Sequence, residues 1–583
     1  MSYSRSILLL FLFSLFYFQG FGQGFLKANG KMIVDEKGNN VLLRGFGLGG
    51  WMLQEGYMLK INKNGQQYKI KAGIEELMGA KQTQAFYDAW LANHVRKIDI
   101  DSLKRWGFNS VRLPMHYNLY TLPVDQEPNK GEQTWLDKGF ALTDSLLSWC
   151  KANQMYLILD LHAAPGGQGN DANIADRDPS KPYLWTSEEN QKKTIALWKK
   201  LAERYKNEPT VAAYDILNEP NYGFQNPEQD RNGTKEKLNA PLRKLMVEIT
   251  KAIREVDQKH IVIIEGNGWG NNYNGIFPLW DSNTVISFHK YWNYNDQASI
   301  ANMVKARDEQ NAPIWVGETG ENSNVWFRDA IHLFETNNIG WSWWPLKKIG
   351  ANNPMEIKSN PNFEAVVKYL DNGGEKPKES NVYSGLMELA IYSRLENTII
   401  HHDVIDAMIR QPFNNETKPF KPNLIQSNSI IYAVDYDLGR NNFAYFDKDT
   451  ADYHVATNKR SAGNRGRIYR NDGVDIEKDV NLYEKYYVSS IEQGEWLQYT
   501  LNVKKSGTYT LKANVASKND DGKVSFSIDS EEVLRNITIP STGNDKVFSL
   551  FEVGKIKLKK GIHKIRIKAD EGGYNFSYLQ FIK

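Results

Sequence analysis

The sequence has a single cysteine and almost no excess charge. Cys150 is the only cysteine among 583 residues, so no disulfide can form within the chain, and its place in an apolar helical pattern predicts a buried thiol. Lys and Arg together number 72, against 69 Asp and Glu. So small an imbalance provides no field that would attract nucleic acid or an anionic membrane. We therefore expect neither as a partner.

Long hydrophobic runs are also absent. The longest extends from Ile7 to Phe18, about 12 residues, whereas a membrane-spanning helix needs about 20. Arg5 precedes this run and the small residues Gly20 and Gly22 follow it, a pattern that predicts a cleaved signal peptide over residues 1–22. No cysteine follows the run, so we expect no lipid anchor there. Export without disulfides favours a secreted or periplasmic protein of bacterial type.

Eight short strand-like runs alternate with amphipathic helical patterns between residues 40 and 345. The runs are Asn40–Arg44, Asn109–Leu113, Met155–Leu161, Val211–Leu217, His260–Ile264, Thr284–His289, Pro313–Val316 and Ile339–Trp344. Eight strands that alternate with helices predict an α/β fold, a (β/α)8 barrel of the TIM type. An open doubly wound sheet would alternate in the same way, but no phosphate-binding glycine loop opens a helix after the first run.

The period changes to two near the C-terminus. Tyr509, Leu511 and Ala513 alternate with polar residues, as do Val524 and Phe526, which predicts an all-β sandwich. The intervening stretch is rich in proline and asparagine and is typical of a linker. We therefore predict a barrel domain over residues 23–410, a linker over 411–427 and a sandwich domain over 428–583.

Two apolar runs end in a glutamate. The segments are YDILNEP, which contains Glu219, and PIWVGETG, which contains Glu318. An isolated glutamate at a strand end is usually a solvated surface charge. A pair at the mouth of one barrel is different, because hydrolysis of a glycosidic bond needs one carboxylic acid and one carboxylate. The pair therefore predicts glycoside hydrolysis.

Other polar or aromatic residues follow the predicted strands in the same way. They are Arg112, His162, Asn218, His289, Tyr291 and Trp344. Barrel enzymes draw their active sites from the carboxyl ends of several strands, so we expect these residues to meet the two glutamates at one mouth. His401 and His402 are a tempting metal pair, but adjacent helical positions point about 100° apart. We expect them on the surface, and we expect no catalytic metal or cofactor.

The predicted barrel resembles glycoside hydrolase family 5 over roughly residues 25–370. The similarity lies in LLRGFGLGGWM, GFNSVRLP, LDLHAAPGG, LNEP, FHKYW, VGETG and WSWWPLK. The resemblance implies a retaining enzyme in which Glu219 is the general acid and base and Glu318 is the nucleophile, with their carboxyl groups about 5 to 5.5 Å apart.

The same resemblance implies roles for the surrounding residues. Arg112 and Tyr291 would hold the Glu318 carboxylate as an anion. Asn218 would bond the 2-hydroxyl of the sugar, and Trp344 would form the floor on which the sugar ring stacks. His162 and His289 would orient sugar hydroxyls or the acid. Trp51, Trp269, Trp292 and Trp326 are candidates for more distant parts of the cleft and equally for loop packing.

The C-terminal domain resembles carbohydrate-binding modules of family 6. The similarity lies in AVDYDLG, YRNDGVDIE, GEWLQYTLNV, SGTYTLKANVAS and GGYNFSYLQFI. It implies that Tyr469 stacks on a sugar and that Asn575 bonds its hydroxyls. The late loop STGNDKVFSLF has no tryptophan for the other half of the clamp, and Val434 replaces a glutamate, which weakens the case for a structural calcium ion. A spacer sandwich in which Tyr469 is merely packed remains the alternative.

We therefore expect a secreted retaining hydrolase of a β-linked polysaccharide, an endo-β-1,4-glucanase, with a sugar-binding sandwich. β-1,3-Glucanase, mannanase and xyloglucanase activities stay open, because similar barrels serve all of them. Transglycosylation and an idle barrel that only binds carbohydrate are further alternatives. Nothing in the sequence requires more than a monomer.

Overall fold

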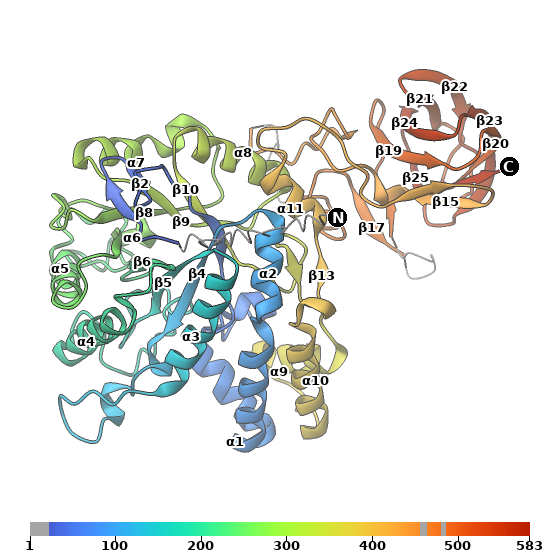
Figure 1. The fold of residues 1–583 in the computed structure, drawn as a ribbon. Coiled ribbons are helices and arrows are strands. Elements are labelled where there is room, and N and C mark those ends of the chain that lie inside the picture. Colours follow the sequence, from blue (N-terminus) through green and yellow to red (C-terminus); the bar gives the residue numbers. More distant parts are fainter. Residues whose placement is uncertain (1–22, 455–462, 480–485) are drawn as a thin grey trace, which may run out of the picture.

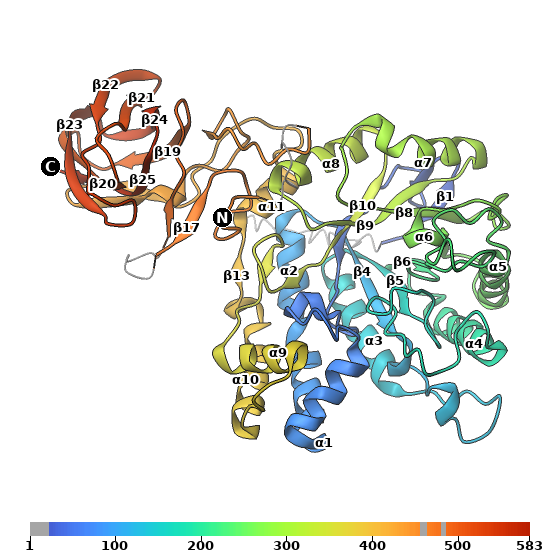
Figure 2. The same cartoon turned by 180° about the vertical axis from the view of Figure 1, so that it is seen from behind.

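The computed structural model describes residues 23–454, 463–479 and 486–583. The predicted signal peptide lies outside the described residues and stays a prediction. The described chain forms two lobes that lie side by side (Figures 1 and 2). The larger lobe holds the blue to yellow part of the chain, and the smaller one holds the orange and red strands.

The larger lobe is a closed parallel barrel of eight strands in the order β10-β3-β4-β5-β6-β7-β8-β9. The strands are β3 (Arg44–Gly47), β4 (Ser110–His116), β5 (Tyr156–Ala163), β6 (Val211–Asp215), β7 (Ile261–Glu265), β8 (Thr284–Lys290), β9 (Ile314–Gly320) and β10 (Gly340–Trp344). The predicted (β/α)8 barrel is confirmed. All eight predicted runs correspond to barrel strands, seven of them within a few residues.

The first strand lies further along the chain than predicted. Its glycines lower strand propensity, so the pattern placed the strand at residues 40–44. The structure needs these glycines because the chain passes close to its neighbours. A Cβ at Gly45 would lie 2.2 Å from the carbonyl oxygen of Ser110, and one at Gly47 would lie 2.4 Å from the Trp344 ring.

Helices surround the barrel and extend below it. They are α1 (Gln67–His94), α2 (Lys97–Trp106), α3 (Asp137–Ala152), α4 (Glu188–Tyr205), α5 (Ala240–Arg254), α6 (Asn267–Gly270), α7 (Gln297–Gln310), α8 (Asn324–Thr336), α9 (Pro361–Asn372), α10 (Glu379–Tyr392) and α11 (His402–Ile409). Cys150 lies buried on α3, as predicted. Between α10 and α11, β13 (Ile399–Ile400) pairs with β12 (Met355–Glu356) and separates the two helices. Two further short strands, β1 (Lys27–Asn29) and β2 (Met32–Val34), form a hairpin before the barrel, and β11 (Lys347–Lys348) pairs with β12.

The smaller lobe consists of two β-sheets. One sheet contains β14 (Asn423–Ile425), β16 (Tyr445–Phe446), β19 (Trp496–Val503), β21 (Lys523–Ile528), β22 (Glu531–Thr538) and β24 (Gly561–Glu571). The other contains β15 (Ser429–Tyr432), β17 (Ile476–Lys478), β18 (Tyr486–Val488), β20 (Gly507–Ser517), β23 (Ser549–Leu558) and β25 (Tyr574–Ile582). The predicted sandwich is confirmed. Its first strand, β14, lies inside the predicted linker and pairs with β19, so the sandwich begins before residue 428.

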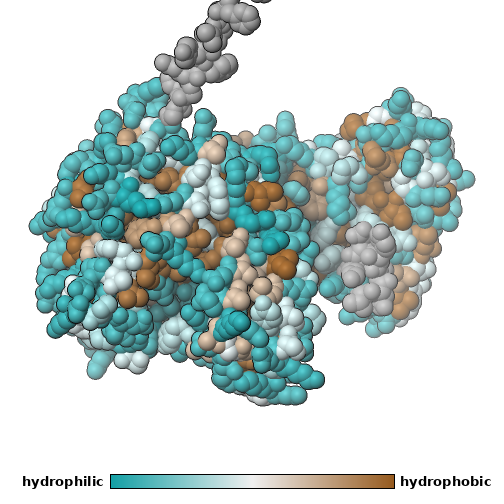
Figure 3. Space-filling view, turned by 60° about the horizontal axis from the view of Figure 1, so that its bottom comes forward, coloured by the Kyte–Doolittle hydropathy of each residue, from teal (hydrophilic) through white to brown (hydrophobic). Residues whose placement is uncertain are grey.

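The surface of both lobes is largely hydrophilic on the face drawn in Figure 3. Apolar side chains appear there as separate areas among polar ones, as on most soluble proteins. Among the described helices, none combines the length and the apolar character that a membrane span requires.

Candidate active site

Arg112 is the centre of a buried network at the carboxyl ends of the strands. Its side chain on β4 is fully buried, and its guanidinium contacts four carboxylates and one amide. The distances are 2.8 Å to Asp215, 2.5 Å to Glu318, 3.1 Å to Glu265, 3.2 Å to Asp160 and 2.7 Å to the Asn218 Oδ1. A buried guanidinium requires such partners. Acidic residues from several strands therefore converge on one cation.

Glu318 lies at the end of β9 and receives bonds from two predicted partners. Arg112 Nη1 donates to its Oε1 at 2.5 Å, and the Tyr291 hydroxyl donates to its Oε2 at 3.2 Å. Both donors stabilise the ionised carboxylate. Burial raises the pKa of Tyr291 well above its ordinary value, helped by the negative charge of Glu318, so this hydroxyl keeps its proton and remains a donor.

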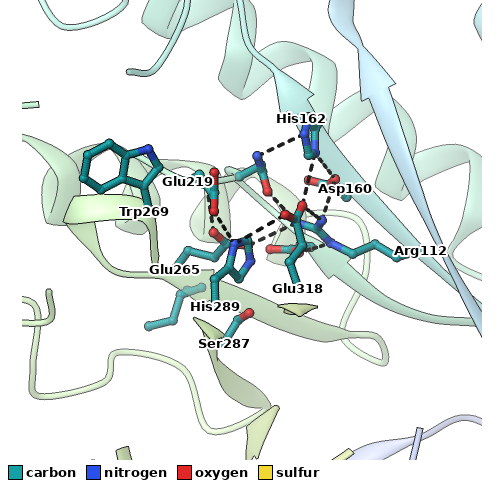
Figure 4. Close-up of polar contacts among 12 residues, drawn as sticks. Arg112, Asp160, His162, Glu219, Glu265, Trp269, Ser287, His289 and Glu318 are labelled. Atoms are coloured by element: carbon teal, nitrogen blue, oxygen red, sulfur yellow. Dashed lines mark hydrogen bonds and ion pairs between the residues drawn. The ribbon is translucent and has the colours of Figure 1, made fainter. Parts of the chain in front are cut away.

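Glu219 follows β6 in an uncommon backbone conformation. Its φ is +43°, which non-glycine residues rarely adopt and which is concentrated at functional sites. The Glu219 backbone N–H donates to Glu265 Oε2 at 2.7 Å and thereby holds this conformation. Its carboxylate lies 2.6 Å from His289 Nδ1. Figure 4 shows His289 beside both Glu219 and Glu265, with Arg112 reaching toward Glu318.

The two predicted catalytic glutamates are close together. Glu219, His289 and Glu318 each offer an atom that lies within 4.8 Å of the others. Burial raises the pKa of Glu219 even though the neighbouring His289 lowers it, and the charges of Glu318 and Glu265 raise it further. The pKa of Glu219 therefore lies above its ordinary value, which favours the protonated form of this carboxyl group. Burial alone would disfavour the cation of His289, but Glu265, Glu318 and Glu219 raise its pKa well above the ordinary value.

Trp344 and His162 form one wall of the site. Their rings stack with centroids 5.0 Å apart and planes 8° apart. Trp344 Nε1 donates to the Tyr57 hydroxyl at 2.9 Å, and its ring occupies the space left by Gly47 and Gly49. Burial opposes a charge on His162, but the Asp160 carboxylate at 2.8 Å raises the pKa of this histidine to about 10.

An open cleft of about 720 Å³ contains these groups. Six of the eight predicted site residues line it, namely His162, Glu219, His289, Tyr291, Glu318 and Trp344. Arg112 and Asn218 lie beneath it, fully buried. Among the candidate tryptophans, Trp269 and Trp292 line the cleft, whereas Trp51 and Trp326 are buried as packing residues. The site residues meet at one mouth, and their roles stay predictions.

Comparisons with known proteins agree with this geometry. Residues 62–350 match the family model for cellulase of glycosyl hydrolase family 5, and residues 467–583 match the model for carbohydrate-binding module family 6. The barrel is a family 5 glycosyl hydrolase domain. The sandwich is a family 6 carbohydrate-binding module.

Several curated relatives share the family 5 domain. A "Beta-xylosidase" of Phanerodontia chrysosporium is 26% identical over 57% of this chain and 73% of its own length. "Endoglucanase C" of Acetivibrio thermocellus is 30% identical over 38% of this chain and 57% of its own length. A "Probable glucan 1,3-beta-glucosidase A" of Aspergillus clavatus is 26% identical over 48% of this chain and 64% of its own length. The chain thus spans little more than half of the endoglucanase.

Three acidic residues around Arg112 were not predicted from the sequence. Asp160 stands two residues before His162 on β5 and therefore on the same side of the strand. Asp215 is the last residue of β6, and Glu265 is the last residue of β7. Glu265 could have been predicted. Each predicted strand from the second to the eighth had a candidate site residue at or near its end, except the fifth, and Glu265 ends that strand.

Glu55 is a further carboxyl group in the cleft of this family 5 domain. It lies in the segment between β3 and α1 and lines the cleft with its Oε1 3.7 Å from His162 Nε2. Burial raises its pKa to about 7, and the nearby His162 opposes this shift. No strand pattern marks this segment, so periodicity could not have identified Glu55.

Glu219, His289 and Glu318 also form a group with metal-ligand spacing, and the expectation of no catalytic metal stays a prediction. Their spacing would suit an ion, but His289 Nδ1 is already 2.6 Å from Glu219. His401, expected on the surface, is buried and bonds Glu356 at 2.7 Å. That expectation is wrong for His401, because its side chain contacts Glu356 and the backbone of Tyr469 in the sandwich. His402 is exposed.

The two predicted sugar-binding residues of the family 6 module make different contacts. Tyr469 is half-buried, packs near Phe420 and Tyr486, and its hydroxyl donates to Asp435. Asn575 donates to the carbonyl of Asp545 in the late loop at 2.7 Å. Val434 is buried in the core of the module. Sugar binding by Tyr469 and Asn575 and the calcium question stay predictions.

Proposed function

We propose that this protein is a retaining β-glycoside hydrolase that cleaves a β-glucan by double displacement. The observation that carries the proposal is the approach of Glu219 and Glu318 to within 4.8 Å, with His289 beside both. Retaining enzymes keep their two carboxyl groups about 5 to 5.5 Å apart, whereas inverting enzymes leave room for a water molecule between them. The spacing here supports the retaining route.

In the first step, Glu318 attacks the anomeric carbon of the sugar bound over Trp344. Arg112 and Tyr291 keep the Glu318 carboxylate in place as an anion. Glu219 gives its proton to the leaving oxygen as the glycosidic bond breaks, which its raised pKa favours. The aglycone leaves as an alcohol, and the sugar remains bound to Glu318 as an ester.

In the second step, water replaces the aglycone. Glu318 has lost its negative charge in the ester, so one of the groups that raised the pKa of Glu219 is gone. The Glu219 carboxylate can then take a proton from the attacking water. The C–O bond to Glu318 breaks, and the carboxylate is restored. A sugar hydroxyl in place of water would give transglycosylation instead.

Endo-β-1,4-glucanase activity is the specific form that we propose first. An open cleft suits attack within a chain, and Trp269 and Trp292 line it in addition to Trp344, so that each can carry a further sugar ring. The similarity to Endoglucanase C supports the same choice. The family 6 module would bind the polymer, and we propose export by the predicted signal peptide because a polymeric glucan lies outside the cell.

Exo action on the terminal sugar, as in a β-1,3-glucosidase, is the second candidate. The segment after Glu55 folds back on itself, with the Gly56 N–H donating to the Gly65 carbonyl at 2.9 Å. Gly65 then packs against Asn173, which lines the cleft together with Glu55 and Tyr57. We expect this contact to close one end of the cleft near the reacting sugar. The glucan 1,3-β-glucosidase relative favours this candidate too.

Reducing-sugar release from a panel of soluble glycans tests the proposal. The panel contains carboxymethylcellulose, barley mixed-linkage glucan, laminarin, mannan and xyloglucan, each with wild type and Glu318→Gln. We expect release from at least one glucan and a loss of at least a thousandfold in the variant, by the scale of nucleophile removal. Endo action lowers viscosity early, whereas exo action releases glucose while viscosity persists. Equal activity in both proteins would refute the role of Glu318.

A further inference from the structure

A buried polar junction joins the family 6 module to the barrel just beyond the strand that carries Glu318. The Asn324 N–H donates to the Asn471 carbonyl at 2.7 Å. The Asn471 Nδ2 donates to the Asn322 carbonyl at 2.8 Å and to Asn324 Oδ1 at 3.1 Å. The Ser323 hydroxyl donates to the Ala451 carbonyl at 2.7 Å. A module on a loose tether would not bury such bonds.

Asp403, on α11, also belongs to the junction. Its Oδ2 accepts bonds from Asn324 Nδ2 at 2.7 Å and from the Asn471 backbone N–H at 2.8 Å. The side chains of Asn322, Asn324, Asp403 and Asn471 are each at least 95% buried, with relative exposures of 0, 4, 1 and 4%. These bonds favour one geometry, because the loss of a partner would leave a further desolvated polar group beside Asn322 Nδ2 and Asp403 Oδ1, which already lack a partner.

The junction sets the start of α8, and α8 holds the loop that follows β8. Ser323 caps α8 by accepting a bond from the Trp326 N–H. Trp326 Nε1 donates to the Asn293 carbonyl at 2.7 Å, and its own carbonyl accepts from Asn295 Nδ2 at 3.0 Å. Residues 293–295 directly follow Tyr291 and Trp292, which line the cleft. A continuous chain of contacts thus runs from Asn471 to the mouth.

Lys290, the last residue of β8, supports the same loop. Its ammonium lies 4.8 Å from the Trp326 ring and donates to Asn293, Asn295 and the Tyr294 carbonyl at 2.5 to 2.9 Å. On the outer side, the Tyr294 ring stacks on His454 of the module with centroids 4.4 Å apart. The module therefore contacts the loop after β8 as well as the loop after β9. Figures 1 and 2 show the orange segment of the chain against α8 and α11.

We propose that the family 6 module is a fixed part of the active site, and that Asn471 and Asp403 are positioning residues for the two mouth loops at residues 291–296 and 321–324. The module keeps Tyr291 in bonding distance of Glu318 and keeps Trp292 on the cleft wall. Its contribution to catalysis is thus separate from any binding of polymer. The catalytic part of this inference rests on the proposed function, but the coupling of the loops to the module does not.

Point variants of the full-length protein test this inference. Asn471→Ala removes the side-chain bonds of the junction on the module side, and Asp403→Ala removes those on the barrel side. If one variant does not fold, the other still tests the inference. Asp403→Asn keeps an oxygen that can accept both bonds. Asn514→Ala is the matched control, because Asn514 is a buried asparagine on β20 of the same sandwich. Thermal unfolding checks that each variant is folded.

Hydrogen–deuterium exchange of residues 291–296 and 321–326 is the first measurement, and it needs no activity. We expect faster exchange in Asn471→Ala and Asp403→Ala, and exchange near that of wild type in Asp403→Asn and Asn514→Ala. The second measurement is the hydrolysis of 4-nitrophenyl β-cellobioside, or of the best soluble glycan from the panel. We expect kcat to fall about ten- to a hundredfold in the two alanine variants with a smaller change in KM, because a misplaced catalytic group slows chemistry.

Unchanged exchange in both loops would overturn the inference. Faster exchange with unchanged kcat on the soluble substrate would overturn the positioning role and leave only a structural joint. A loss confined to insoluble glucan would also contradict it, since that is the behaviour of a tethered binding module. If wild type hydrolyses no glycan, the proposed function fails, and the exchange data alone decide whether the module holds the loops.

Discussion

The charge of His289 influences which nearby carboxyl group holds a proton. Its Nδ1 lies 2.6 Å from Glu219 and 3.7 Å from Glu318, and its Nε2 lies 3.2 Å from Glu265. His289 and Arg112 together lower the pKa of Glu265 to about 2 despite its burial. Glu265 therefore stays ionised, while Glu219 retains a raised pKa. One histidine thus helps to separate two carboxyl groups into different roles.

Replacement of His289 by asparagine tests this division. A cation beside Glu219 favours its ionised form, so its loss raises the pKa of Glu219 further. Because Glu219 acts as the protonated acid, activity is lost as pH rises through that pKa. We expect the alkaline limb of the kcat/KM profile to move up by about one pH unit, at a lower maximal rate. His332→Asn, on α8 away from the cleft, should leave the profile unchanged, and a downward shift in His289→Asn would contradict the account.

At the residue scale, a simple rule predicted much of the site. Polar residues at strand ends identified Glu219, Glu318 and Arg112, because parallel strands bring their carboxyl ends together. The rule could not predict that Arg112 and Asn218 lie beneath the cleft, where Arg112 donates a hydrogen bond to Asn218 and Asn218 contacts His162. Nor could it find Glu55, which stands on an irregular segment whose path depends on the contact between Gly65 and Asn173.

A buried ion pair fastens the short strand β11 to α2. Lys347 Nζ lies 2.8 Å from Asp99 Oδ1, and both side chains are fully buried. The ammonium also donates to the carbonyls of His94 and Ser393. The pair therefore links the ends of α1 and α10 with the segment that follows Trp344. Removal of this ion pair should lower the free energy of unfolding and leave the catalytic chemistry unchanged.

Lys347→Met should lower the free energy of unfolding by about 3 to 5 kcal/mol, because it leaves the Asp99 charge buried without its partner. The double variant with Asp99→Asn should recover part of this loss, since no buried charge remains. Urea unfolding at neutral pH measures both. Lys97→Met, which breaks an exposed pair with Asp101, should change stability by less than about 1 kcal/mol. Additive losses in the double variant would show that the pair is not coupled.

Element types were predictable where the pattern was periodic. Seven barrel strands lie close to their predicted positions, because their short apolar runs reflect burial. The first strand and the break between α10 and α11 were not predictable. Glycine is needed at residues 45 and 47 because the Ser110 backbone and the Trp344 ring lie too close for a side chain. The break between the helices depends on the pairing of β13 with β12, which is distant in the sequence.

At the scale of the whole molecule, the order of a barrel and then a sandwich followed from the change of period along the chain. The junction between them could not be predicted. Asn322, Asp403 and Asn471 are single polar residues, far apart in the sequence and without periodicity, and only the fold brings them together. The start of the sandwich was misplaced for a related reason, since β14 lies among prolines that are typical of a linker.

The most direct test of the central claim is to trap the glycosyl-enzyme. The reagents are the 2,4-dinitrophenyl glycosides of 2-deoxy-2-fluoro-cellobiose and 2-deoxy-2-fluoro-laminaribiose. Fluorine slows both steps because it destabilises their oxocarbenium-like transition states. Transfer of the sugar to the enzyme still proceeds because the dinitrophenyl leaving group needs no proton, so the glycosyl-enzyme should accumulate. Peptide mass spectrometry should then find the sugar on Glu318, with no label in Glu318→Gln. Hydrolysis without any labelled carboxylate, together with a product of inverted anomeric configuration, would contradict the account.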